Sequence, residues 1–142
     1  MAGIDHAHAP LEKRERMTLV RGQVQALLPH ISRTTGCACV LLATCSRTEL
    51  YLHAENGTPD PLAALCDALG AQTADYRAYS VARADGDAAH HLMRVAAGLD
   101  SQILGDDQIV TQVRDAAALA REAQTSDAVL DTLFRRAVTA GK

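Results

Sequence analysis

Apolar and polar residues alternate along the first part of the chain in a way that predicts a strand followed by a helix. Residues 2–6 predict a short strand, which is closed before Pro10 because proline cannot continue a strand ladder. From Leu11 onward apolar residues recur with the period of about 3.6 residues that is typical of an amphipathic helix, and Pro29 is expected to end it. The apolar positions of this helix are Met17, Val20, Val24, Leu27 and Leu28.

Three further strands and one more helix are predicted next. The apolar run 37–42 and the segment 49–53 predict two strands joined by a short polar turn. Pro61 and Gly70 bound a helix, because proline favours a helix start and glycine a helix end. Residues 77–81 predict a fourth, weaker strand, so the order is β-α-β-β-α-β.

This order predicts a ferredoxin-like, split β-α-β arrangement, in which a four-stranded antiparallel sheet carries two helices on one face. Helical patterns at 88–97 and 107–123, and a third helix that Ser126 is expected to cap, predict a helical remainder. We therefore expect an α+β chain with a ferredoxin-like part at 1–84 and a helical part at 85–142. The predicted apolar stripes of the last two helices are Ile109, Val113, Ala116, Ala117 and Ala120, and then Leu130, Leu133, Phe134 and Ala137.

Composition narrows the class of protein. The 142 residues are 48% hydrophobic and 22% charged, which is typical of one globular domain with a substantial core. A net charge of −3 excludes a protein that holds nucleic acid by phosphate neutralisation alone. No apolar run approaches the roughly 20 residues of a membrane span and no secretory signal is evident, so we expect a cytoplasmic protein. Its four cysteines are then expected to be thiols: Cys37, Cys39, Cys45 and Cys66.

The segment 43–51 carries the strongest candidate chemistry. Cys45 follows a predicted buried strand in a polar turn, and Arg47 comes two residues later. Backbone N–H groups and a positive charge stabilise a thiolate, so this arrangement suits a nucleophilic cysteine. The alternative is that Cys45 is an inert small residue at a strand end, with Glu49 pairing with Arg47 and cancelling much of its charge.

Two other segments contain groups that can assist such a thiol. His91 lies beside the apolar stripe of its predicted helix, where it is either the partner in a Cys/His pair or a hydrogen-bonded boundary residue. The loop 98–108 has two glycines and many polar side chains, which can contact a small polar substrate. It can equally be a simple connection in which Asp106 or Asp107 caps the next helix.

Metal and dinucleotide sites receive less support from the sequence. Cys37 and Cys39, together with Cys45, His6 and His8, offer zinc-binding groups, but structural zinc sites usually contain paired Cys-x₂₋₄-Cys motifs. No Gly-x-Gly-x-x-Gly motif is present, so we expect no dinucleotide-binding domain in these residues.

Four blocks of sequence, taken together, resemble the N-terminal catalytic domain of the glutamyl-tRNA reductase family. The resemblance spans nearly the whole chain. It implies that the NADPH-binding and dimerisation domains of the family are absent here, that the chain is cut from a longer polypeptide, and that the fragment is a monomer. The blocks are Gly3-Ile-Asp-His-Ala-His-Ala-Pro10 with Arg14-Glu-Arg16, Thr44-Cys-Ser-Arg-Thr-Glu-Leu-Tyr51, His91-Leu-Met-Arg-Val-Ala-Ala-Gly-Leu-Asp-Ser101 and Leu104-Gly-Asp-Asp-Gln-Ile-Val-Thr-Gln-Val113.

The resemblance implies a cysteine mechanism. Cys45 matches the nucleophile that attacks the ester joining glutamate to tRNA, and NADPH then reduces the thioester to glutamate-1-semialdehyde, which begins tetrapyrrole and haem synthesis. His91 matches a histidine important for activity, and Arg47 matches an arginine that binds the substrate. The implied partners are glutamyl-tRNA and the aminotransferase that takes the next intermediate. The other implied substrate-binding positions are Thr44, Ser46, Ser101, Asp106, Asp107, Gln108 and Gln112.

Two positions depart from the family pattern. Ser46 replaces the usual asparagine, and Asp106 replaces the usual glutamate, so both side chains are shorter. These changes leave open a paralogue with weakened or redirected activity. Without a hydride donor, we expect the chain alone to form the thioester and lose it to water, as an esterase.

Two alternative functions also remain open. The first is a non-catalytic, reductase-like regulatory module that binds tRNA, haem or a partner protein, with cysteines or histidines as haem ligands. The second is a structural domain stabilised by zinc. The histidines concerned are His6, His8, His90 and His91.

Overall fold

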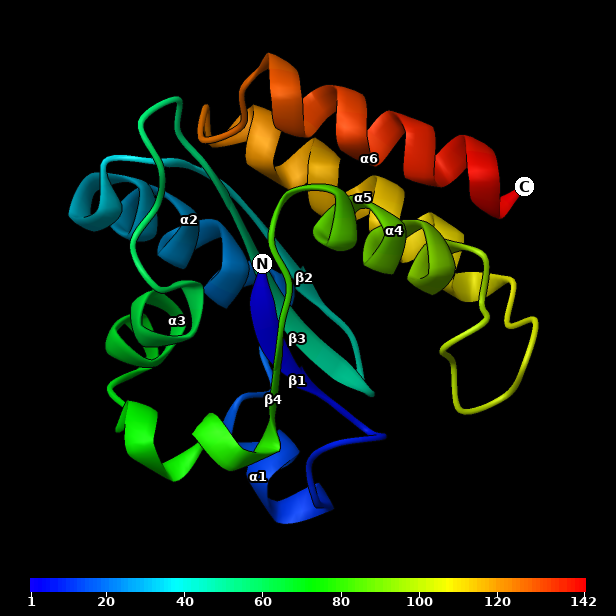
Figure 1. Cartoon of the computed structure of the whole chain (residues 1–142), viewed down its shortest axis with the longest axis horizontal. Helices are drawn as coiled ribbons and strands as arrows, with labels where there is room; N and C mark the ends of the chain where they lie inside the picture. Colours follow the sequence, from blue (N-terminus) through cyan, green and yellow to red (C-terminus); the bar gives the residue numbers. More distant parts are fainter.

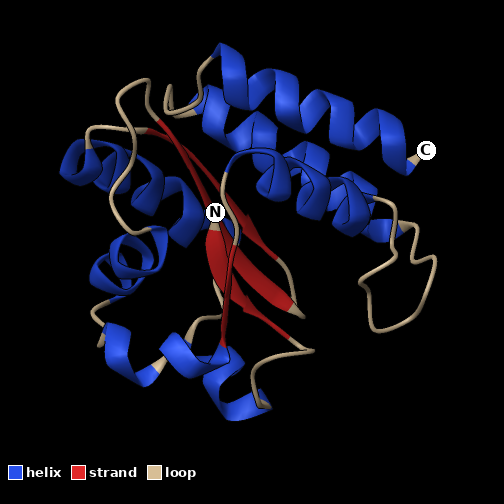
Figure 2. Cartoon of the chain, in the orientation of Figure 1, coloured by secondary structure: helices blue, strands red, loops and turns tan.

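A computed structural model describes all 142 residues and contains one four-stranded sheet with helices on both sides of it (Figures 1 and 2). The strands are β1 (Ala2–Asp5), β2 (Ala38–Ala43), β3 (Arg47–His53) and β4 (Ser80–Ala82). They lie in the order β2-β3-β1-β4, and every neighbouring pair is antiparallel. The predicted α+β class and the four-stranded antiparallel sheet are therefore confirmed.

The helices form two groups, one on each side of the sheet (Figure 1). Helices α2 and α3 pack on one face, whereas α4, α5 and α6 lie together on the other side, with α5 against β2. The short helix α1 follows β1 at one end of the sheet. The bounds are α1 (Leu11–Arg16), α2 (Arg21–Thr35), α3 (Pro61–Leu69), α4 (Asp85–Ala96), α5 (Gln108–Glu122) and α6 (Ala128–Gly141).

The prediction of a single helix from Leu11 is wrong, because this part of the chain forms two helices, α1 and α2. The Thr18 hydroxyl donates to the carbonyl of Arg14 at 3.1 Å just after α1 ends. Val20 is extended, with its N–H donated to the side chain of Gln23 at 2.8 Å, so it starts α2. Val20 is consequently 66% exposed and does not belong to the apolar stripe.

Pro29 lies inside α2 and does not end it, contrary to the prediction. A proline removes one helical hydrogen bond, here the bond to the carbonyl of Gln25 four residues earlier. Gln25 is exposed, so water can solvate that carbonyl. The helix continues until Gly36, which adopts the left-handed conformation with a φ of 70°.

Helix α3 is bounded as predicted. The side chain of Asp60 caps it by accepting from the N–H of Leu62, and Gly70 ends it. The strand predicted at 77–81 is shorter, because Arg77–Tyr79 form a 3₁₀ turn before β4.

The last helix is capped by a different residue from the one predicted. Asp127 occupies the capping position of α6, and its carboxylate accepts from the N–H of Leu130 at 2.9 Å. The hydroxyl of Ser126 instead donates to Asp131 at 2.7 Å. The carboxylate of Asp127 therefore caps α6 in place of the Ser126 hydroxyl.

One hydrophobic core joins the sheet to the helices of both groups. The ring of Phe134 on α6 packs edge-on against Tyr51 on β3, with ring centroids 5.2 Å apart. No helix has both the length and the apolar character needed to cross a membrane. Of the positions predicted for the apolar stripes of the last two helices, Leu133 is only partly buried. All the other positions predicted for the stripes of the last two helices are buried: Ile109, Val113, Ala116, Ala117, Ala120, Leu130, Phe134 and Ala137.

Candidate active site

Four polar side chains line one face of the two central strands. Asp5 on β1 lies opposite Arg47 on β3, and Glu49 and Tyr51 share that face because alternate residues of a strand point the same way. All four are at least 95% buried. Such a buried polar stripe needs partners from within the chain.

A glycine makes room for this stripe. Gly3 lies opposite Glu49 in the β1–β3 ladder. A Cβ atom placed on Gly3 would lie only 2.1 Å from the carbonyl oxygen of Thr48 and 3.0 Å from Cγ of Glu49. The absence of a side chain at this position therefore lets the Glu49 carboxylate lie against the sheet.

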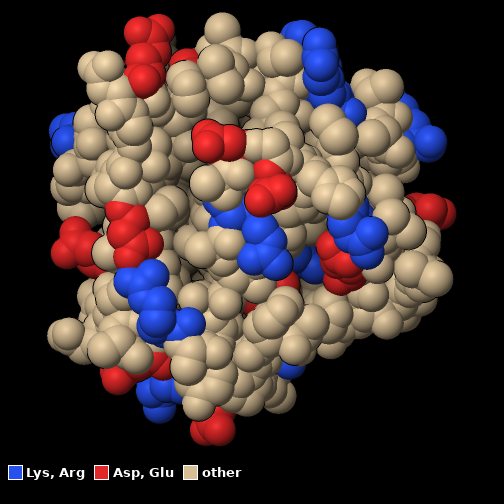
Figure 3. All heavy atoms as spheres, in the orientation of Figure 1, with Lys and Arg blue, Asp and Glu red and all other residues tan.

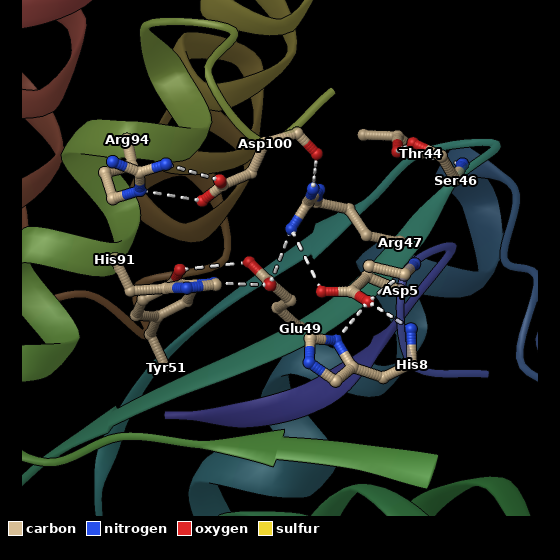
Figure 4. Close-up of polar contacts among 11 residues, drawn as sticks. Asp5, His8, Thr44, Ser46, Arg47, Glu49, Tyr51, His91, Arg94 and Asp100 are labelled. Carbon is tan, nitrogen blue, oxygen red and sulfur yellow. Dashed lines mark hydrogen bonds and ion pairs between the residues drawn. The ribbon is translucent and has the colours of Figure 1, made fainter. Parts of the chain in front are cut away.

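The carboxylate of Glu49 is the centre of a buried hydrogen-bond network (Figure 4). Its Oε2 accepts from Nη1 of Arg47 at 3.0 Å and lies 2.7 Å from Nε2 of His91 on α4. Its Oε1 accepts from the hydroxyl of Tyr51 at 3.1 Å. Burial and then the charge of Glu49 raise the pKa of Tyr51 well above its usual value, so Tyr51 stays a donor. The Arg47–Glu49 pair that the sequence left open is present.

Arg47 is held by oxygen atoms on several sides. Besides Glu49, Nη1 lies 3.8 Å from Oδ2 of Asp5, and Nη2 donates to the backbone carbonyl of Asp100 at 2.8 Å. The Asp100 carboxylate accepts from Arg94 on α4 at 3.0 Å (Figure 4). Arg47 thus ties the sheet to the loop that follows α4, and its side chain is only 2% exposed.

Asp5 is fixed where β1 ends. Its Oδ1 accepts from the backbone N–H groups of Ala7 and His8 at 3.0 and 3.1 Å, and lies 2.8 Å from Nδ1 of His8. Burial acts to raise the pKa of Asp5, but the hydrogen bond from His8 and the charge of Arg47 outweigh it and lower the pKa. A negative charge is therefore kept beside Arg47.

Cys45 lies at the tip of the hairpin that joins β2 to β3. The Thr44 N–H donates to the carbonyl of Arg47 at 2.8 Å, and the Ser46 N–H donates to the hydroxyl of Thr44 at 3.2 Å. The N–H of Cys45 between them makes no hydrogen bond within the chain. The turn therefore holds its backbone while leaving one donor free.

The Cys45 side chain is also exposed, which distinguishes it from the other three cysteines. Cys37, Cys39 and Cys66 are buried. Burial raises the pKa of Cys39 to about 11 and also raises the pKa of Cys66. Cys45 is thus the one thiol that a large substrate can reach directly.

A pocket of about 490 Å³ opens between the end of β1, helix α4 and the loop after it. Of the residues predicted for the site, only His91 and Ser101 line it. The other polar residues that line the pocket include Asp5, His6, His8, Asp87, His90 and Arg94.

Basic and acidic side chains are interspersed on the molecular face shown in Figure 3, without a broad basic surface.

Several predicted site residues lie away from this pocket. Asp106, Asp107 and Gln108 are exposed where α5 begins. Asp107 occupies the N-cap position without a side-chain cap hydrogen bond, whereas Asp106, one residue earlier, accepts from the N–H of Gln108 at 2.9 Å. Gln112 lines a separate cavity of about 160 Å³ beside β2. The structure therefore does not gather all the predicted residues into one enclosed site.

The sequence analysis does not place Asp5 or Tyr51 in the site, and it considers His6 only as a zinc or haem ligand. The spacing Arg47-x-Glu49-x-Tyr51 was the available signal, since alternate strand residues share a face. His6 lines the pocket, and its Nδ1 is the one buried side-chain nitrogen or oxygen atom without a hydrogen-bond partner.

No three His, Cys, Asp or Glu side chains are gathered in an arrangement that could hold a metal ion. Two of the histidines considered as ligands are already bonded to carboxylates. Nδ1 of His8 contacts Asp5, and Nε2 of His91 contacts Glu49.

Comparisons with known proteins agree on one family. The sequence model described as "Glutamyl-tRNAGlu reductase, N-terminal domain" matches residues 2–142. The glutamyl-tRNA reductase of Acetivibrio thermocellus is 42% identical over 144 residues, which cover 100% of this chain and 44% of that protein. The probable multifunctional siroheme biosynthesis protein HemA of Ruminiclostridium josui is 39% identical, over 99% of this chain and 28% of its own length.

A solved structure gives the same result. The glutamyl-tRNA reductase from Methanopyrus kandleri superposes with a TM-score of 0.80 at 30% sequence identity. The match covers 99% of this chain and 32% of that one. The chain thus spans less than half the length of the relatives it matches.

Proposed function

Because the chain belongs to the glutamyl-tRNA reductase family and corresponds to its N-terminal domain, we propose that it performs the acyl-transfer step on glutamyl-tRNA. The sulfur of Cys45 attacks the ester carbonyl carbon, the ester C–O bond breaks, and the glutamyl group remains on Cys45 as a thioester. The observation that carries this proposal is the placement of Cys45. It is the exposed thiol, and it lies two residues from a buried arginine in the hairpin that borders the site.

His91 is the proposed acid–base residue for this step. Its Nε2 contacts the Glu49 carboxylate, which accepts, so the ring proton belongs on Nε2. Nδ1 then keeps a lone pair and has no partner within the chain. In the proposed reaction, His91 takes the proton of the Cys45 thiol and returns it to the ribose oxygen of the departing tRNA.

Arg47 is the proposed anchor for the carboxylate of the glutamyl side chain. Its planar guanidinium suits a two-point contact with a carboxylate, but Nη1 and Nη2 already hold Glu49 and the carbonyl of Asp100. A substrate carboxylate must therefore enter through the pocket and replace the Asp100 carbonyl. We propose that Ser101, which lines that pocket, contacts the same group.

The remaining family-matched positions are proposed contacts for the part of glutamyl-tRNA that stays outside the pocket. They lie on the hairpin tip and around the start of α5, and all are exposed or half-buried. A tRNA is far larger than the pocket, so such peripheral contacts are expected. The positions are Thr44, Ser46, Asp106, Asp107, Gln108 and Gln112.

The residues of this chain do not fit NADPH. The sheet is antiparallel and lacks both a parallel β-α-β crevice and a glycine-rich turn at a helix start. We propose that in longer relatives NADPH supplies the hydride that converts the thioester to glutamate-1-semialdehyde for tetrapyrrole synthesis. An aminotransferase would then receive that product in the cytoplasm.

We further propose that residues 1–84 form a ferredoxin-like, split β-α-β unit, with the helices of residues 85–142 added to it. Support comes from the connections: α2 joins β1 to β2, α3 joins β3 to β4, and β3 lies between β1 and β2. This arrangement brings the end of β1 beside the β2–β3 turn, where Cys45 lies.

Release of glutamate from glutamyl-tRNA tests the proposed function. The chain is expected to release free glutamate faster than the uncatalysed hydrolysis, because water slowly cleaves the thioester. Cys45→Ser should abolish this release, whereas Cys66→Ala, which changes a buried thiol, should retain it. Equal release by the Cys45→Ser variant would show that Cys45 is not the nucleophile.

A further inference from the structure

His6 lies directly beside the turn that carries Cys45. It is the first residue after β1, and its backbone N–H donates to the carbonyl of Ser46 at 2.9 Å. This bond continues the β1–β3 ladder beyond the Asp5–Arg47 pair to the hairpin tip. His6 also lines the pocket that holds His91.

The surroundings of His6 keep its imidazole neutral. Burial and then the positive charge of Arg47 lower the pKa of His6, with Arg14 adding to this and Asp5 and Asp100 opposing it. Protonation would also place a charged N–H at Nδ1, which is buried and has no partner.

The same orphaned atom indicates which ring nitrogen carries the proton. Buried acceptors without a partner are tolerated better than buried donors, so Nδ1 of His6 is best occupied by a lone pair. The proton then lies on Nε2, which is not buried and has no partner within the chain. His6 therefore presents a neutral N–H donor that nothing in the protein uses.

A second unused donor lies in the neighbouring turn. The N–H of Cys45 makes no hydrogen bond, although those of Thr44 and Ser46 on either side are both bonded. A carbonyl under attack by the Cys45 sulfur must come within reach of this N–H. The backbone bond from the His6 N–H to the carbonyl of Ser46 places His6 next to this turn.

We propose that His6 is a further catalytic residue, whose Nε2–H forms an oxyanion hole together with the backbone N–H of Cys45. This inference rests on the proposed function, because it requires Cys45 to be the nucleophile. As the sulfur–carbon bond forms, the carbonyl π electrons move onto oxygen, and the two N–H groups stabilise that charge. When the electrons return, the ester C–O bond breaks and the leaving oxygen takes the proton that the thiol had lost to His91. His6 neither gains nor loses a proton.

Two reactions of the same thiol separate this role from others. Acylation of Cys45 by 4-nitrophenyl acetate passes through an oxyanion, whereas alkylation by iodoacetamide does not. His6→Phe keeps a ring but removes the donor, and should slow acylation roughly a hundredfold while leaving alkylation unchanged. His6→Gln keeps an N–H donor and should recover most of the acylation rate. His30→Phe alters a half-buried histidine on α2, outside this pocket, and should leave both rates unchanged.

The outcomes distinguish the two proposals. If His6→Phe is acylated at the unsubstituted rate, or if both of its reactions slow equally, His6 is not an oxyanion donor. If the unsubstituted chain is alkylated at Cys45 but never acylated, Cys45 is not an acyl acceptor, and the proposed function is wrong whatever the role of His6. If His6→Phe does not fold, alkylation of all four cysteines reveals it, and His6→Leu then replaces it in the comparison.

Discussion

Nε2 of His91 on α4 lies 2.7 Å from Oε2 of Glu49 on β3, and this contact joins a helix to the sheet at the buried centre of the site. Glu49 is 1% exposed and receives two further donors, from Arg47 and Tyr51. The position of the candidate acid–base residue is therefore set by a carboxylate from a distant part of the chain. Removing that carboxylate charge should disturb both stability and geometry.

Glu49→Gln is expected to lower the free energy of unfolding by about 3 kcal/mol, because it leaves the charge of Arg47 buried without its closest counter-charge. Urea denaturation at neutral pH measures this change. The matched control is Arg77→Met, which breaks the exposed pair between Arg77 and Asp60 and should change the free energy of unfolding far less, because solvent screens an exposed pair. Equal losses in the two variants would contradict the central place given to Glu49.

Limited alkylation should distinguish Cys45 from the other thiols. With iodoacetamide at mildly alkaline pH, the label is expected on Cys45 alone, because Cys37, Cys39 and Cys66 are buried. The pKa of Cys39, raised to about 11, protects it further. Peptide mapping after short exposure provides the measurement. Labelling of Cys39 as fast as Cys45 would show that β2 is not packed as described.

His6 should make stability depend on pH in a defined direction. Its pKa is lower in the folded chain than its usual value of about 6.5, so the unfolded chain binds the extra proton first as the pH falls. The free energy of unfolding should therefore decrease below about pH 6.5 until the folded-state pKa is reached. His6→Gln should lack this decrease. Urea denaturation at several pH values checks it, and a pH-independent difference between the two proteins would refute the neutral imidazole.

The sequence predicted best where local periodicity alone sets the structure. A regular repeat of small apolar residues predicts the buried face of α5. Gly70 predicts the end of α3, because ending the helix requires only that this one residue adopt the left-handed conformation. The break before α2 was missed because it depends on hydrogen bonds made by Thr18 and Gln23 that periodicity does not register. The effect of Pro29 on its helix is not predictable from the sequence, because the energetic cost of the lost hydrogen bond depends on whether one carbonyl can reach water.

The site was predictable only in part for a related reason. Cys45 and Arg47 stand out because their chemistry lies in one short turn. The partnership of Glu49 with His91 joins residues that are 42 positions apart, so no local pattern reveals it. The Nε2–H of His6 and the backbone N–H of Cys45 are free because of how their neighbours are bonded in the folded chain, which no sequence pattern indicates.

Acylation of Cys45 is tested directly by the intact mass of the chain after brief incubation with glutamyl-tRNA and rapid acid quenching, followed by peptide mapping. We expect one added glutamyl group per chain, attached to Cys45, and no adduct on the Cys45→Ser variant. A glutamyl group mapped to any other residue, or no adduct together with no glutamate release above the uncatalysed rate, would contradict it.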